Sequence, residues 1–447
     1  MNFALNDEQL EWQQRCRAFA TDVIRPAAPI HDREESVPWE VMKAANAAGL
    51  SGLAAIERTG SDPDGLFGPI YAEEMHFGCA GIALAISGST LAAAGIAASG
   101  TPEQIGQWVP QALGVGDELG IGAYAVTEPQ AGSDVKGLRT TAKRDGDEWV
   151  LNGTKVFITN GGIADVTVVV ATVDPALGHR AQASFVVPKG TPGFRQGKKE
   201  SKIGIRASQT TELIFEDCRI PLENLLGGME KLERKLERAR SGETSAKGAS
   251  NALATFELTR PMVGASALGI AQAAYEWTME YFLNGGEVAD PIERFLDDSS
   301  TAGRPPIERQ NVQQVLADVA TEIEAARLLV WRASWMGRNG VPLAGGQGSM
   351  SKLKAGDVAM WATTRLMDLV GPYAAETPLE KWFRDAKIYQ LFEGTAQVQR
   401  LVISRMQASE FRERMEGARA AVESAERIVA EAADDAVGDA GRELTSA

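Results

Sequence analysis

Cysteine and histidine are scarce in this chain of 447 residues, and neither type is clustered. The three cysteines, Cys16, Cys79 and Cys218, lie far apart, so their spacing predicts neither a disulfide framework nor a metal-binding motif. The three histidines are equally scattered, and we expect no metal site. This pattern is typical of a protein that works in a reducing cytoplasm, which is the location we expect.

Positive charge is also in deficit, because 60 acidic residues outnumber 45 lysines and arginines and leave a formal net charge of -15. Such a balance argues against a nucleic-acid partner and against an anionic membrane surface. The first residues, with Asp7, Glu8 and Glu11, contain neither a basic nor an apolar stretch, so no signal peptide is predicted. One uncharged stretch, 79–99, is long enough to suggest a membrane span. It is rich in Ala, Gly and Ser and is interrupted at 87–90, which favours a pair of buried helices and no membrane partner.

The pattern of apolar residues divides the chain into helical, β and helical parts, so the predicted fold class is α+β with several domains. Residues 1–118 are expected to form an N-terminal all-α domain. Residues 119–228 contain short β-branched runs separated by Asn-Gly, Asp-Gly and Pro-Gly turns, which is typical of an antiparallel β domain. Residues 249–415 return to helical spacing and predict a C-terminal helical bundle. The charged segment 229–248 predicts a short exposed helix or a mobile linker, and the acidic tail, 416–447, is expected to fray.

Capping residues and prolines mark the expected helix ends in the first domain. Asn6 or Asp7 is expected to cap the first helix, and Pro26 and Pro29 are expected to end it. Thr101 followed by a proline predicts another helix start, with the proline in the first turn.

A single carboxylate, Glu393, lies between Phe392 and Gly394 at an expected break between two helical segments. The glycine lets backbone and ligand approach closely, and Phe392 is placed to keep water away. Burial raises the pKa of a carboxylate, which suits a general base. The same residues also fit an ordinary helix end with a glycine cap, so this motif alone leaves a catalytic and a structural role open.

The segment 381–405, which contains Glu393, resembles the C-terminal motif of acyl-CoA dehydrogenases, in which the Glu before Gly-Thr is the α-proton base. The order of helical, β and helical domains is also that of the family, whose last domain is a four-helix bundle. The resemblance implies FAD-dependent α,β-dehydrogenation of an acyl-CoA thioester to the trans-2-enoyl-CoA, with Glu393 as the catalytic base. The neighbouring residues that would contact ligands are Phe392 and Gly394 for the substrate, and Thr395 and Gln397 for the cofactor.

Residues 124–134, Tyr-Ala-Val-Thr-Glu-Pro-Gln-Ala-Gly-Ser-Asp, are similar to the family's flavin loop and are called the 124–134 loop below. The resemblance implies that the Thr127 hydroxyl and loop N–H groups reach the pyrimidine edge of the flavin. Ser133 would reach a phosphate or the CoA chain, and so is a candidate for both cofactor and substrate binding. The cofactor-binding residues implied in this loop are Tyr124, Val126, Thr127, Gly132 and Ser133.

Residues 152–162 are similar to the family strand behind the flavin ring. The resemblance implies that Phe157 stacks on the ring, that Thr159 hydrogen-bonds near its N5 atom, and that Ile158 between them also contacts the cofactor. Phe157 stands where the family more often has Trp, which keeps the aromatic face but removes an N–H donor.

The start of the C-terminal domain offers a candidate for substrate phosphate. In 256–260, Phe-Glu-Leu-Thr-Arg, the resemblance implies that Arg260 contacts the CoA nucleotide, with Glu257 as a second substrate-binding candidate. Some branches of the family carry the catalytic Glu at the position of Thr259, so Glu393 is the only candidate base here.

Two family motifs that hold the ADP half of FAD across a subunit interface are degraded. Arg-x-x-Phe-Gly-x-Pro-Ile reads Asn-Gly-Gly-Glu-Val-Ala-Asp-Pro-Ile at 284–292, and alignment on Pro291 or on Pro305 restores neither Arg nor Phe. Gln-x-x-Gly-Gly-x-Gly reads Met-Asp-Leu-Val-Gly-Pro-Tyr at 367–373. Two assemblies therefore stay open: a homotetramer that holds FAD through other contacts, or an α2β2 heterotetramer in which a paralogous dehydrogenase supplies the missing groups.

An electron-transferring flavoprotein would receive the electrons of such a reaction. Two other interpretations are open: a non-catalytic or half-site subunit of a heteromeric dehydrogenase, and a desulfinase or monooxygenase on the same fold. The retained Glu393, Thr127, Ser133 and Thr159 argue against the first, because a scaffold has no need of them. Glu393 argues against the second, because those reactions do not require it.

Overall fold

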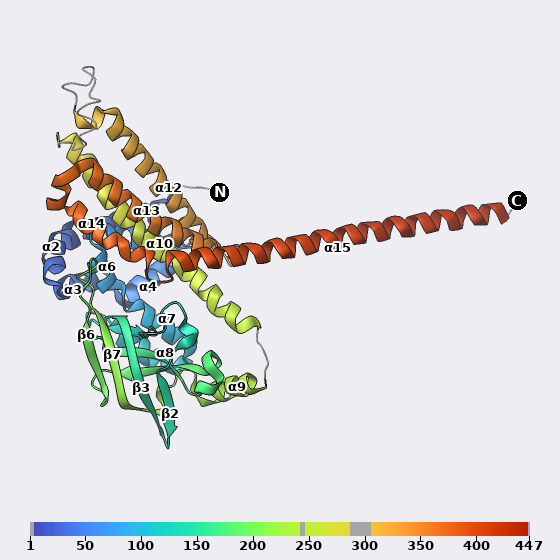
Figure 1. Cartoon of the computed structure of the whole chain (residues 1–447), viewed down its shortest axis with the longest axis horizontal. Helices are drawn as coiled ribbons and strands as arrows, with labels where there is room; N and C mark the ends of the chain where they lie inside the picture. Colours follow the sequence, from blue (N-terminus) through green and yellow to red (C-terminus); the bar gives the residue numbers. More distant parts are fainter. Residues whose placement is uncertain (1–3, 242–245, 287–304, 446–447) are drawn as a thin grey trace.

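The computed structural model describes residues 4–241, 246–286 and 305–445, with side chains except at 246–258 and 430–445. Most helices from the two ends of the chain gather in one part of the molecule, and the strands form the other, with the helices at 90–99, 102–113 and 228–240 beside them (Figure 1). One hydrophobic core cluster runs from Trp12 and Met75 in the N-terminal helices to Trp149 and Phe185 in the sheet. The predicted α+β class with a helical, a β and a helical part is confirmed.

The N-terminal part is helical, as predicted, but its first helix does not end at the prolines. A π-helical turn at Ala20–Ile24 carries the chain directly into a second helix, with Pro26 in its first turn and Pro29 inside it. Asn6 is the N-cap of the first helix and accepts from the Gln9 N–H at 2.9 Å. These helices are α1 (Asp7–Phe19), α2 (Arg25–Glu34), α3 (Trp39–Ala47), α4 (Gly52–Ser61), α5 (Phe67–Gly78), α6 (Ala80–Ser87), α7 (Thr90–Ser99) and α8 (Pro102–Leu113).

The apolar stretch 79–99 forms two helices packed in the protein, α6 and α7. By length and composition alone Ala80–Ser99 is long and apolar enough to cross a membrane, with a mean hydropathy of 1.7 over its most apolar window. The chain breaks between the two helices at Gly88, and Ile82 and Ile96 are fully buried. The prediction of a buried helix pair is confirmed.

The β part is one sheet in the order β1-β4-β2-β3-β7-β6, with β5 paired to β4. The prediction of an antiparallel sheet is wrong for two pairs: β1 runs parallel to β4, and β2 meets β4 in parallel at Thr141 and Thr172. A run of apolar residues does not specify strand direction, and a chain that crosses over between strands can pair them in parallel. The strands are β1 (Gly122–Ala125), β2 (Thr141–Asp145), β3 (Glu148–Thr159), β4 (Val166–Thr172), β5 (Gln182–Pro188), β6 (Phe194–Lys199) and β7 (Thr210–Pro221).

The charged connector forms a helix, α9 (Gly228–Arg240), which is one of the two alternatives we predicted. It is packed more closely than a solvated connector, because Leu232 and Ala239 are buried. The C-terminal bundle follows, as predicted. Its elements are α10 (Ala246–Leu283), α12 (Gln310–Arg338), α13 (Gln347–Val370), the 3-10 turn η6 (Gly371–Glu376), α14 (Pro378–Ala386), the 3-10 turn η7 (Lys387–Gln390) and α15 (Ala396–Thr445).

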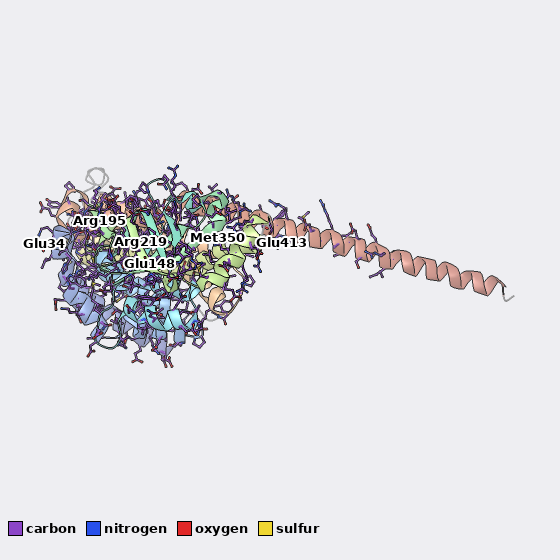
Figure 2. The ribbon with its side chains drawn as sticks, turned by 90° about the horizontal axis from the view of Figure 1, so that it is seen from below. Glu34, Glu148, Arg195, Arg219, Met350 and Glu413 are labelled. Atoms are coloured by element: carbon purple, nitrogen blue, oxygen red, sulfur yellow. The ribbon has the colours of Figure 1, made fainter. Side chains whose placement is uncertain are left out.

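The acidic tail continues α15 instead of fraying. Figure 1 shows α15 projecting far beyond the other helices, and Figure 2 shows Glu413 where it leaves the body. The expectation of a frayed tail is wrong because 416–445 consists largely of Ala, Glu and Arg, which are strong helix formers, and contains no proline.

Candidate active site

Glu393 lies in a sharp turn between η7 and α15. Both Glu393 (φ +52°) and Gly394 (φ +87°) have left-handed backbone. A left-handed non-glycine residue costs roughly 1–2 kcal/mol, so the surrounding structure must hold it. An ordinary glycine cap needs this conformation only at the glycine, and its adoption by Glu393 itself favours the catalytic interpretation. The predicted break between two helical segments is confirmed.

The surroundings of Glu393 suit a proton acceptor. Burial by the surrounding protein raises the pKa of its carboxyl, and the positive charges of Lys352 and Arg260 offset part of that rise. Glu393 is nevertheless an exposed residue, so protein atoms crowd it without covering it. Within the described part of the chain, no cation lies within ion-pair distance of its carboxylate. A carboxylate that is accessible and has a raised pKa can act as a general base.

The residues on either side of Glu393 have contacts of their own. The Phe392 ring stands edge-on to Tyr389, with 5.0 Å between the ring centroids, and is half-buried. The Thr395 hydroxyl accepts from the Val398 N–H at 3.1 Å and so caps α15. Gln397 is exposed in the first turn of that helix. Their contacts with substrate or cofactor stay predictions.

Arg260 lies next to the base, inside the bundle. It is 7% exposed and its Nη1 donates to the Oγ of Ser349 on α13, while its charge lowers the pKa of Glu393. We expected this arginine at the CoA nucleotide, and that contact stays a prediction; the contacts in the structure place it in the cluster around the base. The side chain of Glu257 lies outside the described residues.

The strand with the predicted flavin-stacking residue is bulged at that residue. The register of β3 against β7 shifts between Lys155 and Ile158, and Phe157 adopts φ +59° with its side chain 64% exposed. An exposed aromatic ring on left-handed backbone loses its packing in the core and offers a free face instead. Ile158 is 3% exposed, and the cofactor contact predicted for it stays a prediction.

The 124–134 loop lies directly against this bulge. The Val156 N–H donates to the Thr127 carbonyl at 2.9 Å, which places Thr127 beside Phe157. Thr127 and Thr159 are both half-buried, and Gly132 and Ser133 are exposed farther along the loop. The structure therefore brings the predicted ring-binding residues Thr127, Phe157 and Thr159 together.

A buried ion pair that sequence reasoning missed fixes the loop. Lys155 Nζ lies 2.7 Å from Glu128 Oε1 and also donates to the Val126 carbonyl at 2.9 Å. Burial alone would raise the pKa of Glu128, but hydrogen bonds from Lys155 and Thr140 outweigh it and hold that pKa at about 2. The available signal was the alternation of β3, which puts Lys155 on the same buried face as Leu151.

Tyr124, the first residue of the 124–134 loop, relates that loop to Glu393. It is half-buried at the end of β1, and its ring lies so close to Gly95 of α7 that a Cβ there would be 2.6 Å from Tyr124 Cε2. Burial raises the pKa of Tyr124, and the negative charge of Glu393 adds to the rise. The loop and the catalytic candidate are therefore within electrostatic reach of each other.

Comparisons with known proteins agree with this geometry. Three family models match the chain: the acyl-CoA dehydrogenase N-terminal domain at residues 6–114, the middle domain at 123–218 and the C-terminal domain at 246–408. The mitochondrial short-chain specific acyl-CoA dehydrogenase of Rattus norvegicus is 37% identical over 399 residues, 88% of each chain. A probable acyl-CoA dehydrogenase of Mycobacterium tuberculosis, FadE25, is 36% identical over 406 residues, 90% of this chain and 96% of the relative. The structure of butyryl-CoA dehydrogenase from Megasphaera elsdenii is similar with a TM-score of 0.75 and 33% identity, over 90% of this chain and 99% of that one.

Proposed function

Because the chain belongs to the acyl-CoA dehydrogenase family, we propose that this oxidoreductase converts an acyl-CoA thioester to its trans-2-enoyl-CoA with Glu393 as the base. The observation that carries the proposal is the Glu393 turn. Its carboxylate is accessible, has a raised pKa and lies within electrostatic reach of Tyr124 in the 124–134 loop. A scaffold subunit would have no reason to keep a glutamate on left-handed backbone there.

FAD is the cofactor that the remaining residues fit. Phe157 offers a free aromatic face, and Thr127 and Thr159 lie beside it with hydroxyl groups for the polar edge of a flavin ring. Ser133, exposed in the same loop, is available to a phosphate or to the CoA chain. A bound flavin supplies the two-electron acceptor for the hydride that leaves the β-carbon of the substrate.

The residues of the turn perform the proton transfer. The Glu393 carboxylate accepts the α-proton, so its raised pKa brings it closer to the pKa that a base needs near neutral pH. Negative charge then develops on the thioester oxygen. The Glu393 backbone N–H donates to no acceptor within the described part of the chain and is available to that oxygen, as in an oxyanion hole.

A short acyl group is the first substrate to test. One relative is named for short-chain acyl-CoA and another for butyryl-CoA, and we extend that preference to this chain. We further propose that electrons pass to an electron-transferring flavoprotein in the cytoplasm. Membership of the acyl-CoA dehydrogenase family supports the proposal of this electron acceptor.

The assembly follows from the two degraded ADP motifs. Part of the first motif lies outside the described residues, and the second lies where α13 ends and η6 begins, with Tyr373 54% exposed. Since neither motif offers its usual Arg, Phe, Gln or paired Gly, we propose an α2β2 heterotetramer whose partner supplies these groups. The homotetramer with different contacts is the alternative.

One experiment tests both the proposed activity and the proposed assembly. The chain is expressed alone and with a paralogous dehydrogenase, and its visible spectrum, mass and reduction by butyryl-CoA are measured. The heterotetramer predicts flavin only after co-expression, followed by bleaching and formation of the enoyl product. A yellow homotetramer that is bleached by substrate would contradict the assembly but keep the activity. A flavin-loaded protein that no acyl-CoA reduces would contradict the activity.

A further inference from the structure

Two buried side chains hold the carbonyl groups of the Glu393 turn from beneath. Lys352 on α13 is 1% exposed, and its Nζ donates to the Gly394 carbonyl at 2.8 Å. Gln399 on α15 is fully buried, and its Nε2 donates to the Glu393 carbonyl at 3.1 Å and to the Gly394 carbonyl at 3.3 Å. Both peptide planes that follow the base are therefore fixed by side chains.

This support is closely fitted to the turn. A Cβ at position 394 would lie 2.4 Å from Gln399 Nε2, so only glycine leaves room for the amide. One turn after Lys352, a Cβ at Gly356 would lie 2.7 Å from the Tyr389 carbonyl, so α13 packs directly against the segment that leads to Glu393. Helix packing thus sets the position from which Lys352 reaches Gly394.

Lys352 is an unusual residue for this place if its role is only structural. Within the described part of the chain its ammonium forms no ion pair and donates to the Gly394 carbonyl. Burial lowers its pKa to about 8, Arg260 adds to the lowering, and the negative charge of Glu393 opposes it. A buried cation without an ion pair is costly, and a neutral side chain would pack here at lower cost.

We propose that Lys352 is a positioning residue of the dehydrogenation, which fixes the Glu393–Gly394 turn through the Gly394 carbonyl and places positive charge beneath the base. Gln399 is the neutral second support of the same turn. The inference rests on the proposed function, since it assigns Lys352 a task only if Glu393 is the base. Fixing the peptide planes that follow Glu393 orients its carboxylate, and the charge keeps the carboxylate ionised in the free enzyme.

Three variants separate the two effects, and a fourth serves as the control. Lys352→Met removes both the hydrogen bond and the charge, Lys352→Arg keeps the charge, and Gln399→Met removes only neutral hydrogen bonds. Lys354→Met is the matched control, because Lys354 lies on the same helix and pairs with Glu322, away from the turn. Each variant is compared with the wild-type holoenzyme for kcat, KM, the pH dependence of kcat/KM, flavin content and thermal unfolding.

Lys352→Met is expected to lower kcat on the order of 100-fold with little change in KM, and to move the acid limb of kcat/KM to higher pH. Lys352→Arg should return the acid limb toward its wild-type position while kcat stays low. Gln399→Met should lower kcat without moving the limb, and Lys354→Met should change neither.

A wild-type kcat and an unmoved acid limb in folded Lys352→Met would overturn the inference. If that variant does not fold, Lys352→Arg and Gln399→Met decide, and wild-type kcat in both would overturn it. Glu393→Gln distinguishes a failure of the proposed function from a failure of the role of Lys352. If Glu393→Gln still turns over, Glu393 is not the base and the proposed function fails. If Glu393→Gln is inactive while the Lys352 variants are fully active, only the role given to Lys352 fails.

Discussion

Lys155 on β3 and Glu128 in the 124–134 loop form an ion pair of 2.7 Å in which both side chains are almost completely buried. The pair holds the loop that carries Thr127 against the strand that carries Phe157. Backbone N–H groups of Arg139 and Thr140 also donate to the Glu128 carboxylate, at 2.7 and 3.0 Å. The geometry of the predicted flavin site therefore depends on a pair that is itself buried.

Replacement of Lys155 by Met tests this dependence. It leaves the Glu128 carboxylate buried without its cation, and the free energy of unfolding is expected to fall by roughly 3–5 kcal/mol. Flavin content should fall as well, because the loop loses its anchor. Lys189→Met, which breaks an exposed pair with Asp165, is the control and should cost no more than about 1 kcal/mol in urea unfolding. Equal stability of the two variants would contradict the role given to the buried pair.

The same pair predicts an acid limit to stability. The folded-state pKa of Glu128 lies at about 2, below its ordinary value of 4.5, so the ionised group stabilises the fold above the ordinary value. That contribution is lost as pH falls from about 4.5 toward 2. The free energy of unfolding of the wild type should fall more steeply in this window than that of Glu128→Gln. Parallel curves would contradict the prediction.

Gly95 is expected to tolerate no side chain because of Tyr124. In Gly95→Ala the new Cβ must displace the tyrosine ring, and overpacking of this kind costs roughly 1–3 kcal/mol. Gly106→Ala, on α8, is the matched control, since no atom lies within 4 Å of its added Cβ. It should stabilise the helix by up to about 1 kcal/mol. Thermal unfolding of both variants checks the sign of each change.

Phe157 is expected to bind flavin through its ring face. Phe157→Trp keeps that face and should retain flavin, whereas Phe157→Ala should weaken binding by roughly 0.5–1.5 kcal/mol beyond the lost contact area. Because the ring is 64% exposed, neither change should lower the stability of the flavin-free protein by more than about 0.5 kcal/mol. Flavin dissociation constants and urea unfolding separate the two effects, and a large loss of apoprotein stability would assign Phe157 a structural role instead.

The sequence motifs identified the candidate catalytic and cofactor-binding residues better than they identified the residues that hold them in place. Glu393, Thr127 and Phe157 belong to contiguous motifs, so their neighbours along the chain were enough to single them out. Lys352 is distant in sequence from the turn it contacts, and only the packing of α13 against η7 brings it there. Arg260 likewise donates to Ser349 on another helix, a partner that its motif does not name, and its contact with the CoA nucleotide stays a prediction.

The errors in the predicted fold have a common origin in local patterns. Pro26 and Pro29 are strong local signals for a helix end, but the π-helical turn before them continues the helix. The parallel pairing of β1 with β4 depends on a crossover that apolar alternation does not encode. The tail was expected to fray because it is an acidic chain end, whereas its Ala, Glu and Arg content favours the helix seen in α15.

The central claim is that Glu393 removes the α-proton, and proton exchange tests it most directly. Loss of the α-proton signal of butyryl-CoA in deuterated buffer is followed by NMR with flavin-loaded wild type and with Glu393→Gln, whose flavin content and thioester affinity are matched. We predict exchange in the wild type and none above the enzyme-free rate in Glu393→Gln. Exchange at the wild-type rate in Glu393→Gln would contradict the assignment and require another base.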